Sequence, residues 1–235
     1  MIDVHSHFLP KIDDGPRQVN ESIAMLGDSY QQGVTVCAGT SHLVLHREGS
    51  IELFLEQRDN AIVSLEKALE DIGTVVPKLL YGAEVLLDND ISKFDGLKRL
   101  CISGTNLLLV ELPTKKYNQN YAEWLYLLNL KGIVPIIAHI ERYSYIKVLL
   151  EELESVNVVY QINAKTILKN KWFKFLHNLY YHEKSVLVSS DMHNMGTRKS
   201  CIKKAYDKVC KHYSKHIADD IFEKNAAKLI GLDLK

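Results

Sequence analysis

The sequence contains little cysteine, and its cysteines follow no spacing typical of a reactive or metal-binding site. They are Cys37, Cys101, Cys201 and Cys210. No two form a C-x-x-C pair, and none has an arginine six positions later, which excludes the thiolate-plus-arginine loop of cysteine phosphatases. We therefore interpret them as buried or incidental thiols of a protein from a reducing compartment.

The sequence also lacks long apolar runs and an excess of charge of either sign. No run approaches the roughly 20 residues that cross a bilayer, and the N-terminus lacks the zones of a signal peptide. With 29 basic and 29 acidic residues, the formal net charge is zero, which gives no support for general nucleic-acid or membrane-surface binding. These absences predict a cytoplasmic protein with no nucleic-acid partner and no membrane insertion.

Charge is nevertheless unevenly distributed, because the second half has two basic stretches. These are KTILKNKWFKF at 165–175 and RKSCIKKAYDKVCKHYSKH at 198–216. A solvated helix face is the more common explanation of such runs, and an acidic partner is the alternative.

Apolar runs alternate with amphipathic stretches along the whole chain. Seven runs are predicted strands: Ile2–His5, Val34–Ser41, Pro77–Glu84, Leu107–Glu111, Ile133–His139, Val156–Asn163 and Ser185–Asp191. Most are continuously apolar, as expected for parallel strands covered on both faces, and intervening helices are predicted to end at Gly33, Gly73 and Gly132. Without a linker-like segment, the pattern predicts one α/β domain over residues 1–235. Seven strand–helix units favour a barrel over an open sheet.

Polar side chains stand where the predicted strands end. In chain order they are His5, His7, Asp13, Asp14, His42, Glu84, Glu111, His139, Arg142, Asn163, Asp191 and His193. The C-terminal strand ends of an α/β barrel form its active site, so these residues are expected to converge. Residues two apart on a strand point the same way, so His5 and His7 would bind one cation together. Asp191 and His193 would form a second pair of this kind at the last strand.

Each residue alone also has an ordinary structural explanation. A single His or Glu at a strand end is usually a solvated loop residue, and Asp13 and Asp14 before Gly15 suit a turn. Glu111 is harder to explain in this way, because a buried carboxylate is costly without a partner. Since metal-type ligands end six of the seven strands, we interpret the set as a metal site.

The ligand types limit the metal and the chemistry. Imidazole and carboxylate ligands without sulfur suit manganese, iron or zinc, and their number exceeds the need of one ion, which indicates two or three ions. Such a centre fits phosphate ester hydrolysis. Arg142 and Arg198 follow ligand positions, and guanidinium groups match phosphate oxygens, although a surface salt bridge would explain either arginine alone.

The segments IDVHSHFLPKIDDGP, TSH, YGAE, VEL, IIAHIERY and SSDMHN, in this order, resemble the PHP (polymerase and histidinol phosphatase) superfamily. More closely, the chain resembles its bacterial protein-tyrosine phosphatases associated with capsule and exopolysaccharide genes. The similarity runs from Met1 to about Ile230.

This resemblance implies a distorted (β/α)7 TIM-like barrel (the PHP fold) with a three-metal centre that commonly uses manganese. The implied ligands are His5, His7, Asp14, His42, Glu84, Glu111, His139, Asp191 and His193, with Glu84 bridging two ions. Arg142 and Arg198 would contact phosphate, and a metal-bridging hydroxide would attack phosphorus. The implied substrate is a phosphotyrosyl protein, a membrane-anchored tyrosine kinase that controls polysaccharide synthesis.

Two loops near the predicted site have no assigned role, and two functions are alternatives to a tyrosine phosphatase. After His42 the chain departs from the family pattern, with His46 and Arg47 in a loop expected to border the substrate. The stretch LPTKKYNQNY after Glu111 is either substrate rim or an ordinary polar loop. A small-molecule phosphatase such as histidinol phosphatase is the main alternative activity, and a non-enzymatic scaffold is the other.

Overall fold

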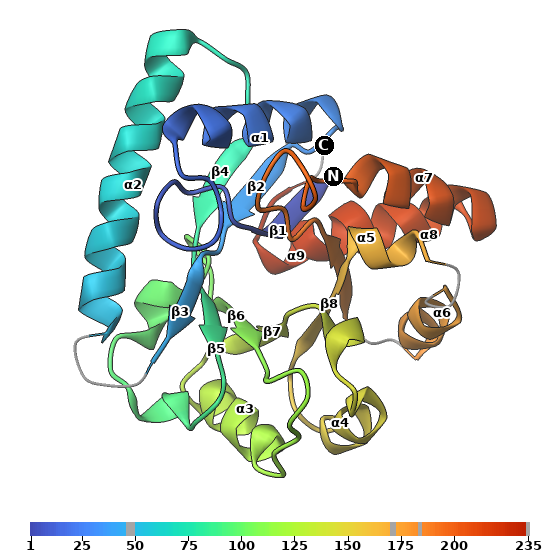
Figure 1. Cartoon of the computed structure of the whole chain (residues 1–235). Helices are drawn as coiled ribbons and strands as arrows, with labels where there is room; N and C mark the ends of the chain where they lie inside the picture. Colours follow the sequence, from blue (N-terminus) through green and yellow to red (C-terminus); the bar gives the residue numbers. More distant parts are fainter. Residues whose placement is uncertain (46–49, 170–172, 183–184, 234–235) are drawn as a thin grey trace.

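Parallel strands form the centre of the molecule, and helices surround them (Figure 1). The computed structural model describes residues 1–45, 50–169, 173–182 and 185–233. A first sheet has the order β1-β2-β4 and a second has the order β3-β5-β6-β7-β8-β9. The strands are β1 (Ile2–Ser6), β2 (Val36–Gly39), β3 (His42–Val44), β4 (Lys78–Tyr81), β5 (Glu84–Leu86), β6 (Leu107–Glu111), β7 (Val134–Ile137), β8 (Val159–Asn163) and β9 (Val186–Ser189).

Contacts between the first and last strands close the two sheets into a barrel. Ser6 and Met192 form a parallel bridge, and the amide of His7 donates to the carbonyl of Met192 at 2.9 Å. The amide of Asp191 donates to the carbonyl of His5, also at 2.9 Å. The predicted parallel α/β fold with a distorted TIM-like barrel is therefore confirmed.

Two of the seven predicted strands end earlier than expected, and each is followed by a further short strand that was not predicted. The runs 34–41 and 77–84 contain β2 and β4, which end at Gly39 and Tyr81, and β3 and β5 begin three residues later. β2 pairs with β4, whereas β3 pairs with β5, so both segments cross together from the first sheet to the second. A continuous apolar run does not reveal this change of partner, because the pairing depends on segments that are distant in the sequence.

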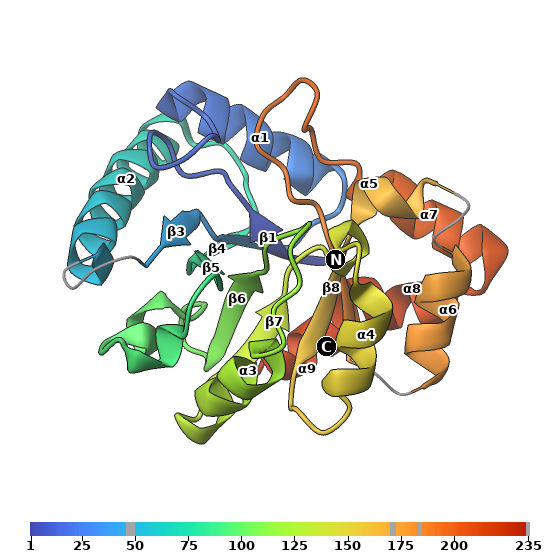
Figure 2. The same cartoon turned by 60° about the horizontal axis from the view of Figure 1, so that its bottom comes forward.

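Helices connect successive strands and cover the outside of the barrel (Figure 2). They are α1 (Val19–Gln31), α2 (Ser50–Ile72), α3 (Tyr121–Leu130), α4 (Ile146–Glu152), α5 (Ala164–Ile167), α6 (Phe173–Tyr181), α7 (Ile202–His212), α8 (Lys215–Asp219) and α9 (Asn225–Leu229). Short turns of 3-10 helix cover Ile91–Lys93, Leu97–Leu100 and Ile140–Arg142, and a π-helical turn covers Asp220–Lys224. The predicted ends after α1, α2 and α3 are confirmed, since Gly33, Gly73 and Gly132 adopt φ angles of 87°, 66° and 73°.

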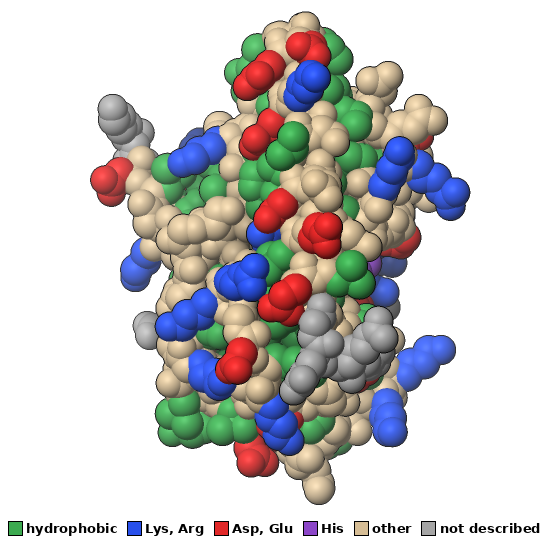
Figure 3. Space-filling model, turned by 90° about the vertical axis from the view of Figure 1, so that its left-hand side faces the viewer, with side chains coloured by type: hydrophobic (Ala, Val, Ile, Leu, Met, Phe, Trp, Pro, Cys, Tyr) green, Lys and Arg blue, Asp and Glu red, His purple; other side chains and the backbone are tan. Residues whose placement is uncertain are grey.

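The longest helix, α2, packs one face on the barrel and leaves the other in solvent. Its own residues Phe54, Leu55 and Leu65 are buried against the barrel. Its outer face carries interspersed acidic and basic side chains (Figure 3). None of the helices in the described part of the chain combines the length and the apolar character that crossing a bilayer requires.

Apolar side chains fill the barrel interior toward the N-terminal ends of the strands and leave the C-terminal end to polar groups. Ile2 and Val4 of β1 pack there with Val36, Leu109 and Leu187 from other strands. A separate, larger cluster lies between the strands and the helices. The barrel interior is thus filled by apolar side chains, and the functional groups must lie at its C-terminal end.

Candidate metal centre

The nine predicted ligands converge at the C-terminal end of the barrel. Each has a side-chain nitrogen or oxygen within 3.5 Å of such an atom in another member of the set. They come from seven different segments of the chain, beginning at β1 and ending in the loop after β9. The structure therefore brings together all nine residues that the family resemblance implies as ligands.

A bulge in β1 directs His5 into the site. Asp3 pairs with Cys37 and Ser6 with Gly39, so β1 has one residue more than β2 over this stretch. Ile2 and Val4 face the barrel interior below the bulge. A regular strand would then turn His5 outward, whereas the extra residue returns it to the interior.

Glu84, the first residue of β5, lies at the centre of the cluster and is fully buried. Its Oε2 lies 3.2 Å from Nε2 of both His5 and His7 and 3.0 Å from Nδ1 of His42. Its Oε1 lies 3.0 Å from Nε2 of His139. The two oxygens therefore face different histidines, which is the arrangement that a bridging carboxylate requires.

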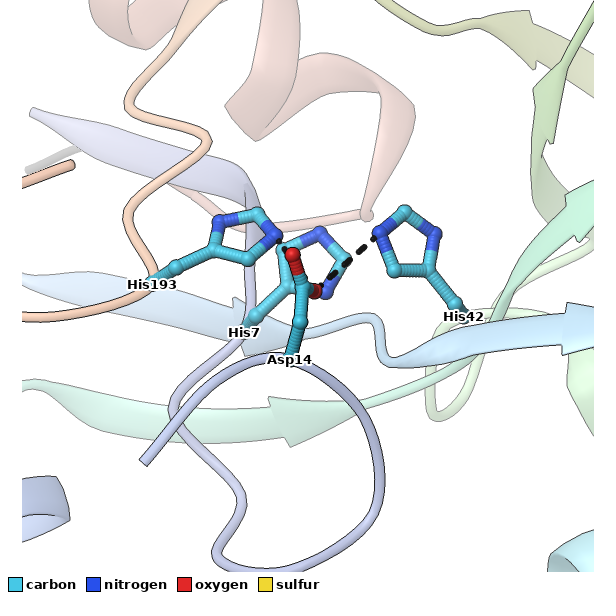
Figure 4. Close-up of side chains that lie close together, drawn as sticks. All are labelled: His7, Asp14, His42 and His193. Carbon is cyan, nitrogen blue, oxygen red and sulfur yellow. Dashed lines mark ion pairs between the residues drawn. The ribbon is translucent and has the colours of Figure 1, made fainter. Parts of the chain in front are cut away.

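The ligand atoms form three overlapping groups, within each of which all atoms lie within 4.8 Å of one another. The first contains His7, Asp14, His42 and His193 (Figure 4), the second His5, His7 and Glu84, and the third His42, Glu84 and Glu111. His7, His42 and Glu84 each belong to two groups. Residues shared in this way suit adjacent ions better than one isolated ion.

His139 and Asp191 complete the cluster from opposite sides. Nε2 of His139 lies 3.4 Å from Oε1 of Glu111, and Oδ1 of Asp191 lies 3.5 Å from Nε2 of His5. Both residues adopt positive φ, at 30° and 51°. Such backbone conformations are uncommon for residues other than glycine and concentrate at functional sites.

That Asp191 and His193 bind one cation together, as predicted for His5 and His7, stays a prediction. Both residues follow β9 rather than lie on it, and Oδ1 of Asp191 lies 3.5 Å from Nδ1 of His193. The carboxylate of Asp191 faces His5, whereas Nε2 of His193 lies 3.2 Å from Oδ1 of Asp14.

The tautomers of the first two histidines test whether a cation fits. Nδ1 of His5 lies 3.0 Å from Oε1 of Gln161, and Nδ1 of His7 lies 2.7 Å from Oδ2 of Asp13. Both partners accept hydrogen bonds, so each Nδ1 carries a proton, and each ring in its neutral form has its lone pair at Nε2. The two Nε2 atoms are only 3.2 Å apart. A shared cation satisfies two lone pairs that face each other in this way.

A further nitrogen supports the same conclusion. Nε2 of His193 is buried and makes no hydrogen bond within the described residues, although Oδ1 of Asp14 lies 3.2 Å away as an ion-pair partner. Such atoms are rare unless a ligand completes them. The donor set is therefore chemically suited to divalent ions of the first transition row.

Electrostatics within the cluster shift several pKa values strongly. Burial opposes protonation of His5, but Glu84 and Asp191 raise its pKa to about 9. The pKa of His7 rises to about 10, since Asp13 and Glu84 outweigh its burial. Burial and the neighbouring His7 lower the pKa of His193 to about 3. Without a metal, protons on His5 and His7 neutralise the carboxylates that would otherwise bind cations.

The two predicted arginines lie at the mouth of the centre. Nη1 of Arg198 lies 2.7 Å from Oδ2 of Asp14, and its Nη2 lies 3.4 Å from Oδ1 of Asp191. Arg142 lies 4.0 Å from Glu111 and is 46% exposed. Both line a cavity of about 240 Å³ beside Asp191, so an oxyanion near the carboxylate cluster would meet two guanidinium groups.

Sequence reasoning missed the residues that orient the ligands. Asp13 accepts from His7 and from the amide of His42, and Gln161 accepts at 2.6 Å from the amide of His139. Asn163 donates to Oδ2 of Asp191 at 2.7 Å. Asp13 and Asn163 were visible at strand ends without a defined role. Gln161 could have been noticed because it is a polar residue inside the apolar run VVYQIN.

The remaining predictions concern two loops. His46 and Arg47 lie outside the described residues. In the stretch after Glu111, Tyr117 donates to Glu152 and packs against Tyr121 and Tyr145. This tyrosine is thus part of a local aromatic cluster.

Comparisons with known proteins agree with this geometry. The family model described as "Capsular polysaccharide synthesis, CpsB/CapC" matches residues 1–231. The chain is 30% identical over 246 residues to the tyrosine-protein phosphatase CpsB of Streptococcus agalactiae and 32% identical over 243 residues to CpsB of Streptococcus pneumoniae, with 98% of each chain covered in both cases.

The fold has a solved counterpart. A structure described among those of YwqE from Bacillus subtilis and CpsB from Streptococcus pneumoniae, "unique metal-dependent tyrosine phosphatases", matches with a TM-score of 0.81 and 26% identity. The match covers 100% of this chain and 96% of the other. This chain therefore belongs to the CpsB/CapC family of capsular polysaccharide synthesis.

Proposed function

We propose that this chain is a metal-dependent phosphotyrosine-protein phosphatase. The observation that carries the proposal is the cluster around Glu84, whose three overlapping ligand groups lie next to an arginine-lined cavity. Relatives that are similar over nearly the whole chain bear the name tyrosine-protein phosphatase. The whole of residues 1–235 would form the single catalytic domain.

The proposed ligands are the nine clustered residues, and the three groups support three divalent ions. The ions are manganese in this proposal, with iron or zinc as alternatives for the same nitrogen and oxygen donors. When bound, they supply Lewis acidity, activate water for phosphate ester hydrolysis and neutralise phosphate charge. Gln161 and Asp13 hold the ligand histidines in one tautomer.

Arg142 and Arg198 are the residues that we assign to the phosphate group. Their guanidinium groups would hold its oxygens through charge-assisted hydrogen bonds as charge develops on them. The pairing of Arg198 with Asp14 and Asp191 fixes its position before substrate arrives. We assign the cysteines no part in the reaction, because none of them belongs to the ligand cluster and burial raises the pKa values of Cys37, Cys101 and Cys201.

The proposed substrate is a phosphotyrosyl protein in the cytoplasm. The family description, capsular polysaccharide synthesis, supports a membrane-anchored tyrosine kinase that controls capsule or exopolysaccharide synthesis as the partner. The alternative is a small-molecule phosphatase such as histidinol phosphatase.

Kinetic comparison of two substrates tests the proposal. We expect kcat/KM for a phosphotyrosyl peptide to exceed that for histidinol phosphate, and EDTA to abolish both activities. Asp191→Asn should lose activity, whereas Asp71→Asn, the same change at an exposed site on α2, should behave as wild type. A preference for histidinol phosphate would support the alternative, and EDTA-resistant activity would contradict the proposal.

A further inference from the structure

The cavity beside the metal centre extends beyond the two arginines. Besides Arg142, Asp191 and Arg198, its lining includes Asn163, Lys165 and Lys199. Its volume of about 240 Å³ corresponds to roughly eight water molecules at ~30 Å³ each. This exceeds the space that the oxygens of one phosphate group fill, so part of the cavity is free for another group of the substrate.

The four cations that line this cavity differ in their partners. Arg198 pairs with Asp14 and Asp191, and Lys199 pairs with Asp28 at 2.8 Å. Lys165 is exposed and forms no ion pair with any described residue. Its Nζ donates instead to the carbonyl of Thr197 at 2.9 Å, a neutral acceptor. Arg142 has Glu111 at 4.0 Å. Among the described residues, Lys165 is thus the cation of this cavity that has no carboxylate within ion-pair distance.

The position of Lys165 is fixed from two sides. It lies in α5 between Asn163, whose amide donates to Glu141, and Thr166, whose hydroxyl donates to Glu141 at 2.9 Å. Glu141 is buried, so these bonds anchor α5 to the 3-10 turn that bears Arg142. The bond to Thr197 joins the lysine to the loop that bears Arg198.

An ammonium group has three protons to donate, and the Thr197 carbonyl takes one. The other protons of Lys165 are available to an anion that enters the cavity. An exposed lysine without a carboxylate is common on protein surfaces, but this one shares a cavity with both proposed phosphate-binding arginines. A substrate held there by its phosphate would therefore bring neighbouring groups to Lys165.

We propose that Lys165 forms a second anion subsite, which selects substrates with an anionic group close to the phosphotyrosine. A carboxylate of Asp or Glu and a second phosphate share the required chemistry. This inference rests on the proposed phosphatase function, because the arginines must first hold the phosphotyrosine. Lys165 is then a specificity-determining residue, and the metal centre performs the hydrolysis.

Kinetics with matched peptides test the subsite. The peptides carry one phosphotyrosine flanked by glutamine, by glutamate or by a second phosphotyrosine. We expect the wild-type protein to prefer the two anionic peptides by about three- to five-fold in kcat/KM, the scale of an exposed ion pair. The difference should lie mainly in KM and should shrink at high salt, which screens exposed charges.

Variants of Lys165 give the discriminating result. Lys165→Gln should remove the preference, Lys165→Glu should reverse it, and Lys165→Arg should retain it. Lys211→Gln, the same change on α7 outside the cavity, should keep the wild-type preference. The ratio between peptides is the readout, so a general loss of activity in one variant does not mimic the effect.

The outcomes separate this inference from the proposed function. If the wild-type protein hydrolyses p-nitrophenyl phosphate and all peptides equally, the subsite is contradicted while the phosphatase stands. A preference that persists in Lys165→Gln would also overturn it. If the metal-loaded wild-type protein hydrolyses none of these compounds, the proposed function itself fails.

Discussion

The metal centre has a buried side and an exposed side, and the two are built differently. On the buried side, His5 and Glu84 lie on β-strands and their side chains have no exposed surface. On the exposed side, Asp14 and Arg198 extend from loops, with 60% and 36% of their side chains exposed. Strands position groups more rigidly than loops, so the buried side is suited to holding ions and the exposed side to receiving phosphate.

The charges on the two sides also respond differently to solvent. Buried charges interact strongly and are weakly screened, whereas water and salt weaken those at the surface. This explains why the pKa shifts of His5, His7 and Glu84 are large. A change of a buried ligand should therefore disturb metal binding, whereas loss of an arginine on the exposed side should disturb catalysis with metal retained.

Glu84→Gln should have the largest effect, because it removes the charge at the centre of the buried side. We expect loss of bound metal and a fall in turnover of about 1,000-fold or more, since metal Lewis acidity is worth several kcal/mol. Elemental analysis and p-nitrophenyl phosphate hydrolysis measure the two effects. Glu70→Gln, an exposed site on α2, is the matched control. Full metal content in Glu84→Gln would place the ions elsewhere.

Arg198→Ala and Arg142→Ala should impair phosphate binding on the exposed side and leave metal binding intact. By analogy with the loss of one oxyanion donor, we expect kcat/KM to fall about 100- to 1,000-fold while metal content stays at the wild-type level. Arg99→Ala removes an exposed arginine that pairs with Glu52 at the surface, and it should have no effect on catalysis. Unchanged catalysis in both test variants would mean that phosphate binds at another position.

Metal binding should depend steeply on pH. With pKa values raised to about 9 and 10, His5 and His7 hold protons more tightly than free imidazoles do in the metal-free protein. A metal must displace the protons held there, so its apparent affinity rises with pH up to about 10, by ~10-fold per pH unit for each proton that leaves. Calorimetric titration of EDTA-treated protein with Mn²⁺ in buffers of different ionisation enthalpy counts the protons. Binding at pH 7 with no proton release would contradict this description.

Asp13→Asn should have a smaller effect on the buried side. The amide oxygen still accepts from His7, but the charge that supports this histidine is lost. Residues that orient metal ligands in this way typically contribute 10- to 100-fold in affinity or activity, and we expect metal affinity to fall by about this factor. Asp71→Asn provides the same chemical change at an exposed site. Wild-type affinity in Asp13→Asn would limit its role to the turn before Gly15.

The sequence alone predicted the barrel and the ligand cluster because both depend on local patterns. Buried parallel strands appear as apolar runs, and the residue types at their ends identify metal chemistry, as at His42, Glu84 and His139. Since the carboxyl ends of barrel strands meet at one face, the convergence of these residues follows from the fold.

Features that depend on pairing between distant segments could not be predicted in the same way. The bulge that redirects His5 exists only relative to β2, and the early ends of β2 and β4 at Gly39 and Tyr81 reflect a change of partner strand. Gln161 orients His5 across 156 positions of sequence. Lys165 stood in a basic stretch that resembled a solvated helix face, and only the cavity distinguishes it from its neighbours.

Whether the protein is a metal-dependent phosphatase is decided by the metal content of the purified protein, with p-nitrophenyl phosphate hydrolysis measured on the same sample with and without EDTA and added Mn²⁺. We expect two or three bound ions per chain, activity that EDTA abolishes and Mn²⁺ restores, and full activity when the cysteines are replaced by serine. Absence of metal and of activity after Mn²⁺ addition, or activity that survives EDTA, would contradict the proposed metal-dependent hydrolysis.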